Sequence, residues 1–161
     1  MNTATLTSPV ETTTRRFPTR AKIALAVASL LVVAFAALAM HMSYVPDALD
    51  TSTTMRSANG LFSASYEPAL DPIVINQIHE WTVHLENADG NPIEDAHVHV
   101  DGGMPQHGHG LPTAPQVTEY LGNGDYLVEG MKFNMGGWWV MTVDAEVGGQ
   151  TDRATFNMML D

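Results

Sequence analysis

One stretch of the chain is apolar for long enough to cross a membrane. Residues 23–40, IALAVASLLVVAFAALAM, contain no charged side chain, and a helix needs about 20 apolar residues to span a bilayer. Arg15, Arg16, Arg20 and Lys22 all come just before this stretch. By the positive-inside rule, the N-terminus therefore stays in the cytoplasm and the rest of the chain lies across the membrane.

The apolar stretch divides the chain into four parts. We interpret residues 1–22 as a cytoplasmic tail, 23–42 as a transmembrane anchor, 43–60 as a linker and 61–161 as a folded domain. Ala37-Leu38-Ala39 also fits the small-x-small pattern of a signal-peptidase site, so a signal peptide is the alternative to an anchor. The apolar run is longer than the usual core of a signal peptide, which favours the anchor. Both alternatives place the folded domain outside the cytoplasm, on the periplasmic side of the cell membrane.

The chain beyond the apolar stretch is strongly acidic and free of cysteine. Residues 41–161 carry three basic and seventeen acidic side chains, and the whole chain has a formal net charge of −11. This balance argues against nucleic acid as a partner, because phosphate binding requires clustered Lys and Arg. The absence of cysteine excludes disulfides and thiolate sites. Imidazole and thioether groups are then the ligands left for a soft metal ion.

The folded domain alternates between apolar and polar side chains with a period of two. This is the pattern of half-buried strands, and the Gly-rich turns at 122–124 and 148–149 predict hairpins. Short strands separated by turns predict an all-β fold, an immunoglobulin-like β-sandwich of about seven strands. The predicted strands are 61–67, 78–87, 95–101, 116–121, 125–133, 139–147 and a last one around 154–160.

A run rich in Gly and Pro, GGMPQHGHGLP at residues 102–112, presents Met104, His107 and His109. We interpret it as a loop rather than a strand, because its glycines allow sharp turns that bring these side chains to one point. Such a loop is able to present soft ligands to a metal ion. A loop that only joins two strands is the alternative.

A second Gly-rich turn, residues 134–137, carries Met135 where no strand packing requires a methionine. In the alternating pattern, Met131 falls on the apolar face of its strand. It therefore fits either a core position or a ligand role. If the two turns lie at the same end of the sandwich, Met135 joins the methionine and histidines of the loop in one site. Mixed thioether and imidazole ligands suit Cu(I), and imidazoles alone suit Cu(II).

The alternating pattern also predicts the strand face on which several other histidines and methionines lie. Met141 and Met158 fall on apolar faces, which predicts core positions. His79 falls on the apolar face of its strand, and we interpret it as a partly buried histidine whose hydrogen bonds are satisfied. His97 and His99 lie on one face of a strand, about 6.6 Å apart, where they fit both a shared ion and an ordinary solvated face.

Two runs of the sequence resemble a known family. GGMPQHGHGLPTAPQVT, from residue 102, and LGNGDYLVEGMKFNMGGWW, from residue 121, resemble the YtkA-like domain, close to the FixH group of membrane-anchored proteins. The resemblance covers roughly residues 60–160 and implies an immunoglobulin-like fold. It also implies copper, because members are associated with copper binding or delivery, and FixH-like members with assembly of copper-containing respiratory oxidases. The positions that match as metal ligands are Met104, His107, His109, Met131 and Met135.

Sequence and resemblance together predict a membrane-anchored copper-binding protein, a chaperone or assembly factor for a copper-containing membrane enzyme. Its predicted partner is a copper-dependent oxidase or a copper transporter. The alternative is a metal-free module that docks on such a partner through the same histidines and Trp138. No enzyme is predicted, because the chain shows no nucleophile set beside a base, no HExxH motif and no Gly-rich phosphate loop before a helix.

Overall fold

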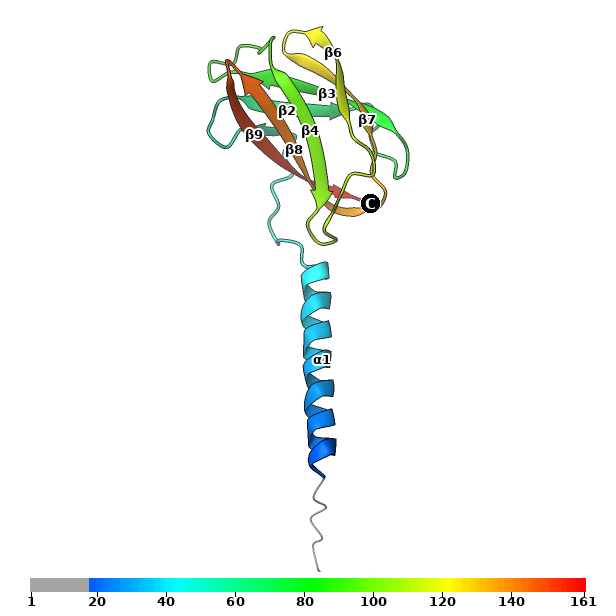
Figure 1. The fold of residues 1–161 in the computed structure, drawn as a ribbon. Helices are drawn as coiled ribbons and strands as arrows, with labels where there is room; N and C mark the ends of the chain where they lie inside the picture. The colour runs from blue at the N-terminus through cyan, green and yellow to red at the C-terminus, as the bar shows by residue number, and fades with distance from the viewer. Residues whose placement is uncertain (1–17) are drawn as a thin grey trace, which may run out of the picture. The chain divides into compact units, whose positions relative to one another are not determined.

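The computed structural model describes residues 18–161, which fall into two compact units divided between His41 and Met42. The first unit is a single helix, and the second holds every strand (Figure 1). Most of the predicted cytoplasmic tail, residues 1–17, lies outside the described residues.

Helix α1 (Thr19–Ser43) contains the predicted anchor. Thr19–His41 is the one helix in the described part of the chain that is long and apolar enough to cross a membrane, and its length and composition fit an anchor and a signal sequence equally. The Ser29 hydroxyl donates a hydrogen bond to the Leu25 carbonyl oxygen at 2.9 Å. This bond satisfies the hydroxyl within the helix, as a lipid environment requires.

The second unit is a sandwich of two antiparallel sheets, which confirms the predicted all-β fold. One sheet has the strand order β1-β2-β3-β7-β6 and the other β5-β4-β8-β9. Seven of the strands correspond to the predicted ones, and two further strands, β1 and β5, are only three and two residues long. The strands are β1 (Thr54–Arg56), β2 (Ser63–Pro68), β3 (His79–Glu86), β4 (His97–Met104), β5 (His109–Gly110), β6 (Gln116–Gly122), β7 (Asp125–Met131), β8 (Gly137–Val147) and β9 (Gln150–Leu160).

The folded unit begins earlier than predicted. Residues 43–60 were interpreted as a linker, but Thr54–Arg56 form β1 and pair with β2. The Asp152 carboxylate of β9 also accepts backbone hydrogen bonds from Asn59 (2.9 Å) and Leu61 (3.2 Å). These bonds attach the segment between β1 and β2 to β9. The last part of the predicted linker therefore belongs to the domain.

The core lies between the sheets and is built from the inward positions of the alternating strands. Its largest fully buried side chains include Trp81, Phe133 and Trp139, whose rings pack in sequence at 6.1 Å and 5.0 Å between centroids. Met141 and Met158 are buried, as predicted. Such well-packed aromatic groups dominate the stability of a core.

The Gly-rich run at 102–112 is not the loop predicted from its composition. Strand β4 continues through Gly102 and Gly103 to Met104, and β5 runs back beside it. A Cβ atom at Gly102 would collide with the sulfur of Met141, and one at Gly103 would lie 2.8 Å from the His109 carbonyl oxygen. These two glycines therefore permit close packing within a sheet, and only part of the run is a turn.

Candidate metal site

The site is built on the hairpin between β4 and β5. The Met104 carbonyl oxygen accepts hydrogen bonds from the backbone N–H of His107 (3.1 Å) and of Gly108 (2.9 Å). Gly108 has φ +65°, a left-handed conformation that glycine adopts without a steric cost. The tight turn returns the chain so that His109 lies directly opposite Met104.

The side chain of Met104, the last residue of β4, packs against the start of β8. Its side chain is 1 % exposed, and its methyl carbon would lie 2.9 Å from a Cβ atom at Gly137, the first residue of β8. Gly103 of β4 pairs with Val140 of β8, so the end of β4 and the start of β8 are neighbours (Figure 1). The two Gly-rich segments therefore meet at one end of the sandwich.

The two histidines of the hairpin lie close together. The rings of His107 and His109 are 5.9 Å apart between centroids and nearly parallel, at 21°. His107 is exposed and His109 is half-buried. His109 Nδ1 lies 3.0 Å from the Gly110 carbonyl oxygen. When Nδ1 donates this bond, the lone pair of Nε2 is left free, which is the arrangement that metal-binding histidines usually show.

Trp139 connects the hairpin with the turn that carries Met135. The indole Nε1 of Trp139 donates a hydrogen bond to the Met135 carbonyl oxygen at 3.1 Å. The His109 ring lies edge-on to the Trp139 ring, 5.8 Å away between centroids. Trp139 is fully buried and Met135 is half-buried. One rigid aromatic side chain thus contacts His109 on one side and fixes the backbone of Met135 on the other.

The sequence predicts Trp139 only as the first residue of the strand 139–147. A signal for its second role is present in the sequence, because it is the first inward-facing aromatic residue after the Gly-rich turn at 134–137. Because Trp139 lies near the start of β8, it is close to the residues of the turn that precedes this strand.

Solvent reaches the hairpin through an open hollow of about 410 Å³. Met104, Pro105 and His109 line it on the hairpin side, and Thr142 and Arg153 line its far side. Its floor is made largely of glycine backbone, because Gly102, Gly103 and Gly110 also line it. The hollow therefore exposes the backbone of the hairpin to solvent, whereas Met104 itself is buried.

Met131 lies elsewhere. It is fully buried in β7 of the other sheet, opposite His79 of β3. His79 accepts a hydrogen bond from Trp81 Nε1 at 3.1 Å and is 8 % exposed, as expected for a satisfied, partly buried histidine. The structure groups Met131 with the core methionines, and the sequence motif alone connects it with the hairpin.

The available donors decide which ion the site fits. Within residues 18–161, no three His, Asp or Glu side chains lie together in a way that could hold a metal ion. The hairpin itself offers two imidazoles and the thioether of Met104, and the thioether of Met135 belongs to the turn whose backbone Trp139 holds. Hard cations prefer several oxygen ligands, whereas thioether and imidazole groups fit a soft ion such as Cu(I). The residues present are thus compatible with copper.

A comparison with protein families matches residues 63–144 to the YtkA-like family, about half of the chain. The chain belongs to the YtkA-like family. The matched region of this YtkA-like protein runs from the start of β2 into β8 and includes the hairpin, Trp139 and Met135. A comparison with curated proteins finds no match.

Replacing Gly137 with alanine in this YtkA-like protein should destabilise the domain and displace Met104. Gly137 has φ +116°, and a new Cβ atom would lie 2.9 Å from the Met104 methyl carbon. Overpacking costs about 1–3 kcal/mol, in addition to about 1–2 kcal/mol for the left-handed backbone. Urea unfolding of the full chain in detergent micelles measures the loss.

Gly148→Ala is the matched control for this prediction. Gly148 has φ +58°, and nothing lies within 4 Å of its added Cβ atom. The control carries a left-handed backbone cost without any new contact, and Gly137→Ala should exceed it by at least the overpacking cost. Equal losses of unfolding free energy in the two variants would contradict tight packing of Met104 against residue 137.

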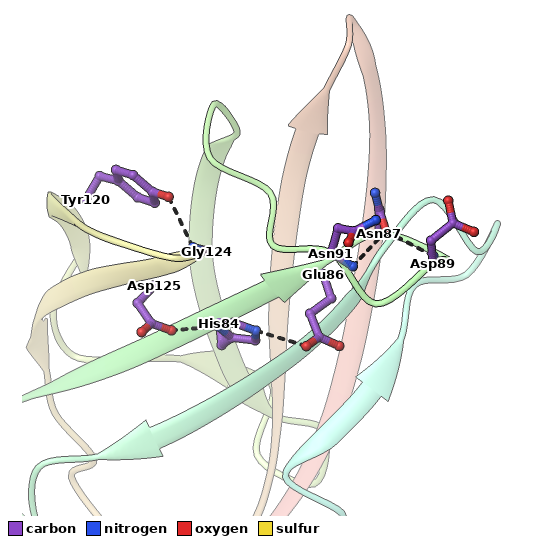
Figure 2. Close-up of polar contacts among 8 residues, drawn as sticks. All are labelled: His84, Glu86, Asn87, Asp89, Asn91, Tyr120, Gly124 and Asp125. Carbon is purple, nitrogen blue, oxygen red and sulfur yellow. Dashed lines mark hydrogen bonds and ion pairs between the residues drawn. The ribbon is translucent and has the colours of Figure 1, made fainter.

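His84 has a structural role in the same domain, where it pairs with two carboxylates. Figure 2 shows its ring between two carboxylates, with Nδ1 2.7 Å from Asp125 Oδ1 and Nε2 3.3 Å from Glu86 Oε1. Only the protonated ring is able to donate to both. Partial burial works against the charged ring, but the hydrogen bonds and charges of Asp125 and Glu86 outweigh it and raise the pKa of His84. Both nitrogens are engaged, so this ring is poorly suited to bind a metal.

The stability of the domain should depend on pH through His84. Because its pKa is raised in the folded state, its contribution is complete below the unfolded pKa of about 6.5 and is lost as pH rises through the folded pKa. Partly exposed ion pairs contribute about 1 kcal/mol or less. Urea unfolding of wild type and His84→Gln at pH 5.5 and pH 8.5 should show a larger difference at pH 5.5. A difference that is independent of pH would contradict the prediction.

Proposed function

We propose that this protein is a membrane-anchored, periplasmic copper-binding protein that acts as a chaperone or assembly factor for a copper-containing membrane enzyme. The observation that supports the proposal is one hairpin that carries Met104, His107 and His109, with Trp139 contacting His109 and the backbone of the Met135 turn. Family membership and the apolar helix α1 support an anchored domain of this family. In this reading α1 remains as a single-pass anchor and the domain faces the periplasm.

The donor set favours transport rather than catalysis. Thioether and imidazole ligands hold Cu(I) without the thiolates that disulfide chemistry would consume. The ligands include the exposed His107 at the tip of a short hairpin, where a partner is able to reach the ion. A site of this kind suits the handover of copper to a copper-dependent oxidase or a copper transporter.

Copper titration of the full chain in detergent micelles tests the proposal. We expect one Cu(I) per chain with a dissociation constant below about 1 µM, and weaker binding in Met135→Leu. Met159→Leu is the matched control, because Met159 is 50 % exposed on β9 and should not affect binding. Absence of binding, or equal effects of the two substitutions, would contradict the assignment.

A metal-free docking module is the second candidate. The observation that favours it is the burial of Met104, which the packing against Gly137 explains without a metal. In that case the hairpin would contact a membrane oxidase or transporter directly, with Trp138 beside it. Association with such a partner that persists after copper chelation would support this function, and a requirement for copper in the association would exclude it.

A further inference from the structure

A second pair of histidines lies on the outer face of β4. His97 and His99 are both exposed, whereas Val98 and Val100 between and after them face inward. In a strand, residues two apart lie about 6.6 Å from each other on the same face. Neither imidazole makes a hydrogen bond to any group within the described residues 18–161, in contrast to His79 and His84. Both rings are therefore free to bind a ligand.

A carboxylate faces this pair from the neighbouring strand. His97 lies opposite Glu146 of β8, and His99 lies opposite Asp144. Directly opposed side chains in an antiparallel pair have Cβ atoms about 4.5–5.5 Å apart. Glu146 is exposed, and its carboxylate has no hydrogen-bond partner in the part of the chain that the structure describes. Two imidazoles and one free carboxylate are thus presented on one small area of the sheet.

Asp144 differs from Glu146 because it is already engaged. The Arg153 guanidinium binds it in a bidentate manner, with Nη2 2.7 Å from Asp144 Oδ2. This pairing neutralises the charge of Asp144 and leaves Glu146 as the unengaged carboxylate that faces the histidines from β8. In the described part of the chain, no strand pairs with His97 or His99 on the other side of β4, because β5 pairs only with Gly103 and Met104.

We infer that His97, His99 and Glu146 form a second metal site, which takes a borderline divalent ion such as Zn²⁺ or Cu²⁺. Imidazole and carboxylate ligands suit these ions and offer no thioether for Cu(I). No three such side chains converge beforehand within residues 18–161, so the exposed side chains assemble around the ion by changing rotamer. The site is independent of the proposed function, because it shares no ligand with the hairpin.

Zn²⁺ titration of the full chain, in detergent micelles and without an affinity tag, tests the inference. The titration is made in the His107→Ala/His109→Ala background, so that the hairpin contributes no imidazole. We expect one Zn²⁺ per chain. Changes that only support a ligand already cost about 10- to 100-fold in affinity, so His97→Ala or His99→Ala should weaken binding at least about tenfold. Glu146→Gln should weaken it less.

Two further measurements complete the test. Glu129→Gln is the matched control, because Glu129 is an exposed carboxylate on β7 of the other sheet, and it should leave Zn²⁺ affinity unchanged. In the wild-type chain, the imidazole NMR signals of His97 and His99 should both shift with Zn²⁺. Absence of Zn²⁺ binding in the background variant, or binding that His97→Ala/His99→Ala leaves unchanged, would overturn the inference. Loss of Cu(I) binding at the hairpin would overturn only the proposed function.

Discussion

The double variant His107→Ala/His109→Ala is expected to lose Cu(I) affinity by at least about 100-fold. Changes behind a metal ligand already cost about 10- to 100-fold, and this variant removes two direct imidazole ligands. The fold should persist, because His107 is exposed and His109 is only half-buried. Competition with a Cu(I) chelator of known affinity measures the change in the full chain.

The matched control for this prediction is His97→Ala/His99→Ala. It removes the same number of imidazoles from the outer face of β4 and should leave Cu(I) affinity within about twofold of wild type, since a change of 0.4 kcal/mol corresponds to about that factor. Similar losses in the two double variants would show that Cu(I) binds to histidines in general and would contradict a site at the hairpin.

Trp139→Ala is expected to cause the largest loss of stability, about 3–5 kcal/mol. Trp139 is fully buried and packs against Phe133 at 5.0 Å between ring centroids. Such a loss is a large fraction of the stability of a small domain, so the variant should unfold at much lower urea concentration. Trp139→Phe should retain most of the packing and lose the N–H that holds the Met135 carbonyl oxygen.

A comparison of two Trp→Phe variants separates packing from positioning. Trp138 Nε1 also donates a hydrogen bond at 3.1 Å, but to Asn157 Oδ1 and from a half-buried position. Trp139→Phe should weaken Cu(I) binding more than Trp138→Phe does. The loss in Cu(I) affinity should also be larger than any difference in stability between the two variants explains. If both variants bind Cu(I) as wild type does, Trp139 has a structural role only.

The regular strands could be predicted because alternation reports burial directly. The positions from Trp81 to Leu85 alternate between buried and half-buried as predicted. The hairpin turn at 122–124 formed where expected, with Asn123 and Gly124 at positive φ. Two hydrophobic faces that must be buried leave few arrangements besides a sandwich. The match to the YtkA-like family confirms the resemblance read from the sequence.

The short strands could not be predicted from local pattern. Glycine disfavours a strand by its conformational entropy, yet Gly102 and Gly103 are in β4 because the Met141 side chain and the His109 backbone fill the space of a Cβ atom. That requirement is set by residues about 40 and 6 positions away in the sequence. Strand β1 is likewise defined by its pairing with β2, which three residues alone do not encode.

The candidate site shows the same division between local and distant information. Composition picked out the hairpin histidines and the methionines near them, but thioether chemistry suits a core and a metal site equally. Met104 and Met131 are both buried; pairing places Met104 opposite His109 and Met131 opposite His79. The contact of His84 with Asp125 likewise depends on the pairing of β3 with β7, which the local pattern of β3 does not contain.

X-ray absorption spectroscopy of the Cu(I)-loaded full chain tests the central claim most directly. The claim is that Cu(I) binds at the hairpin through both thioether sulfur and imidazole nitrogen. Wild type should show sulfur and nitrogen scatterers around copper, and His107→Ala/His109→Ala should lose the nitrogen contribution. A copper environment of nitrogen and oxygen alone, or one that the double variant leaves unchanged, would contradict the claim.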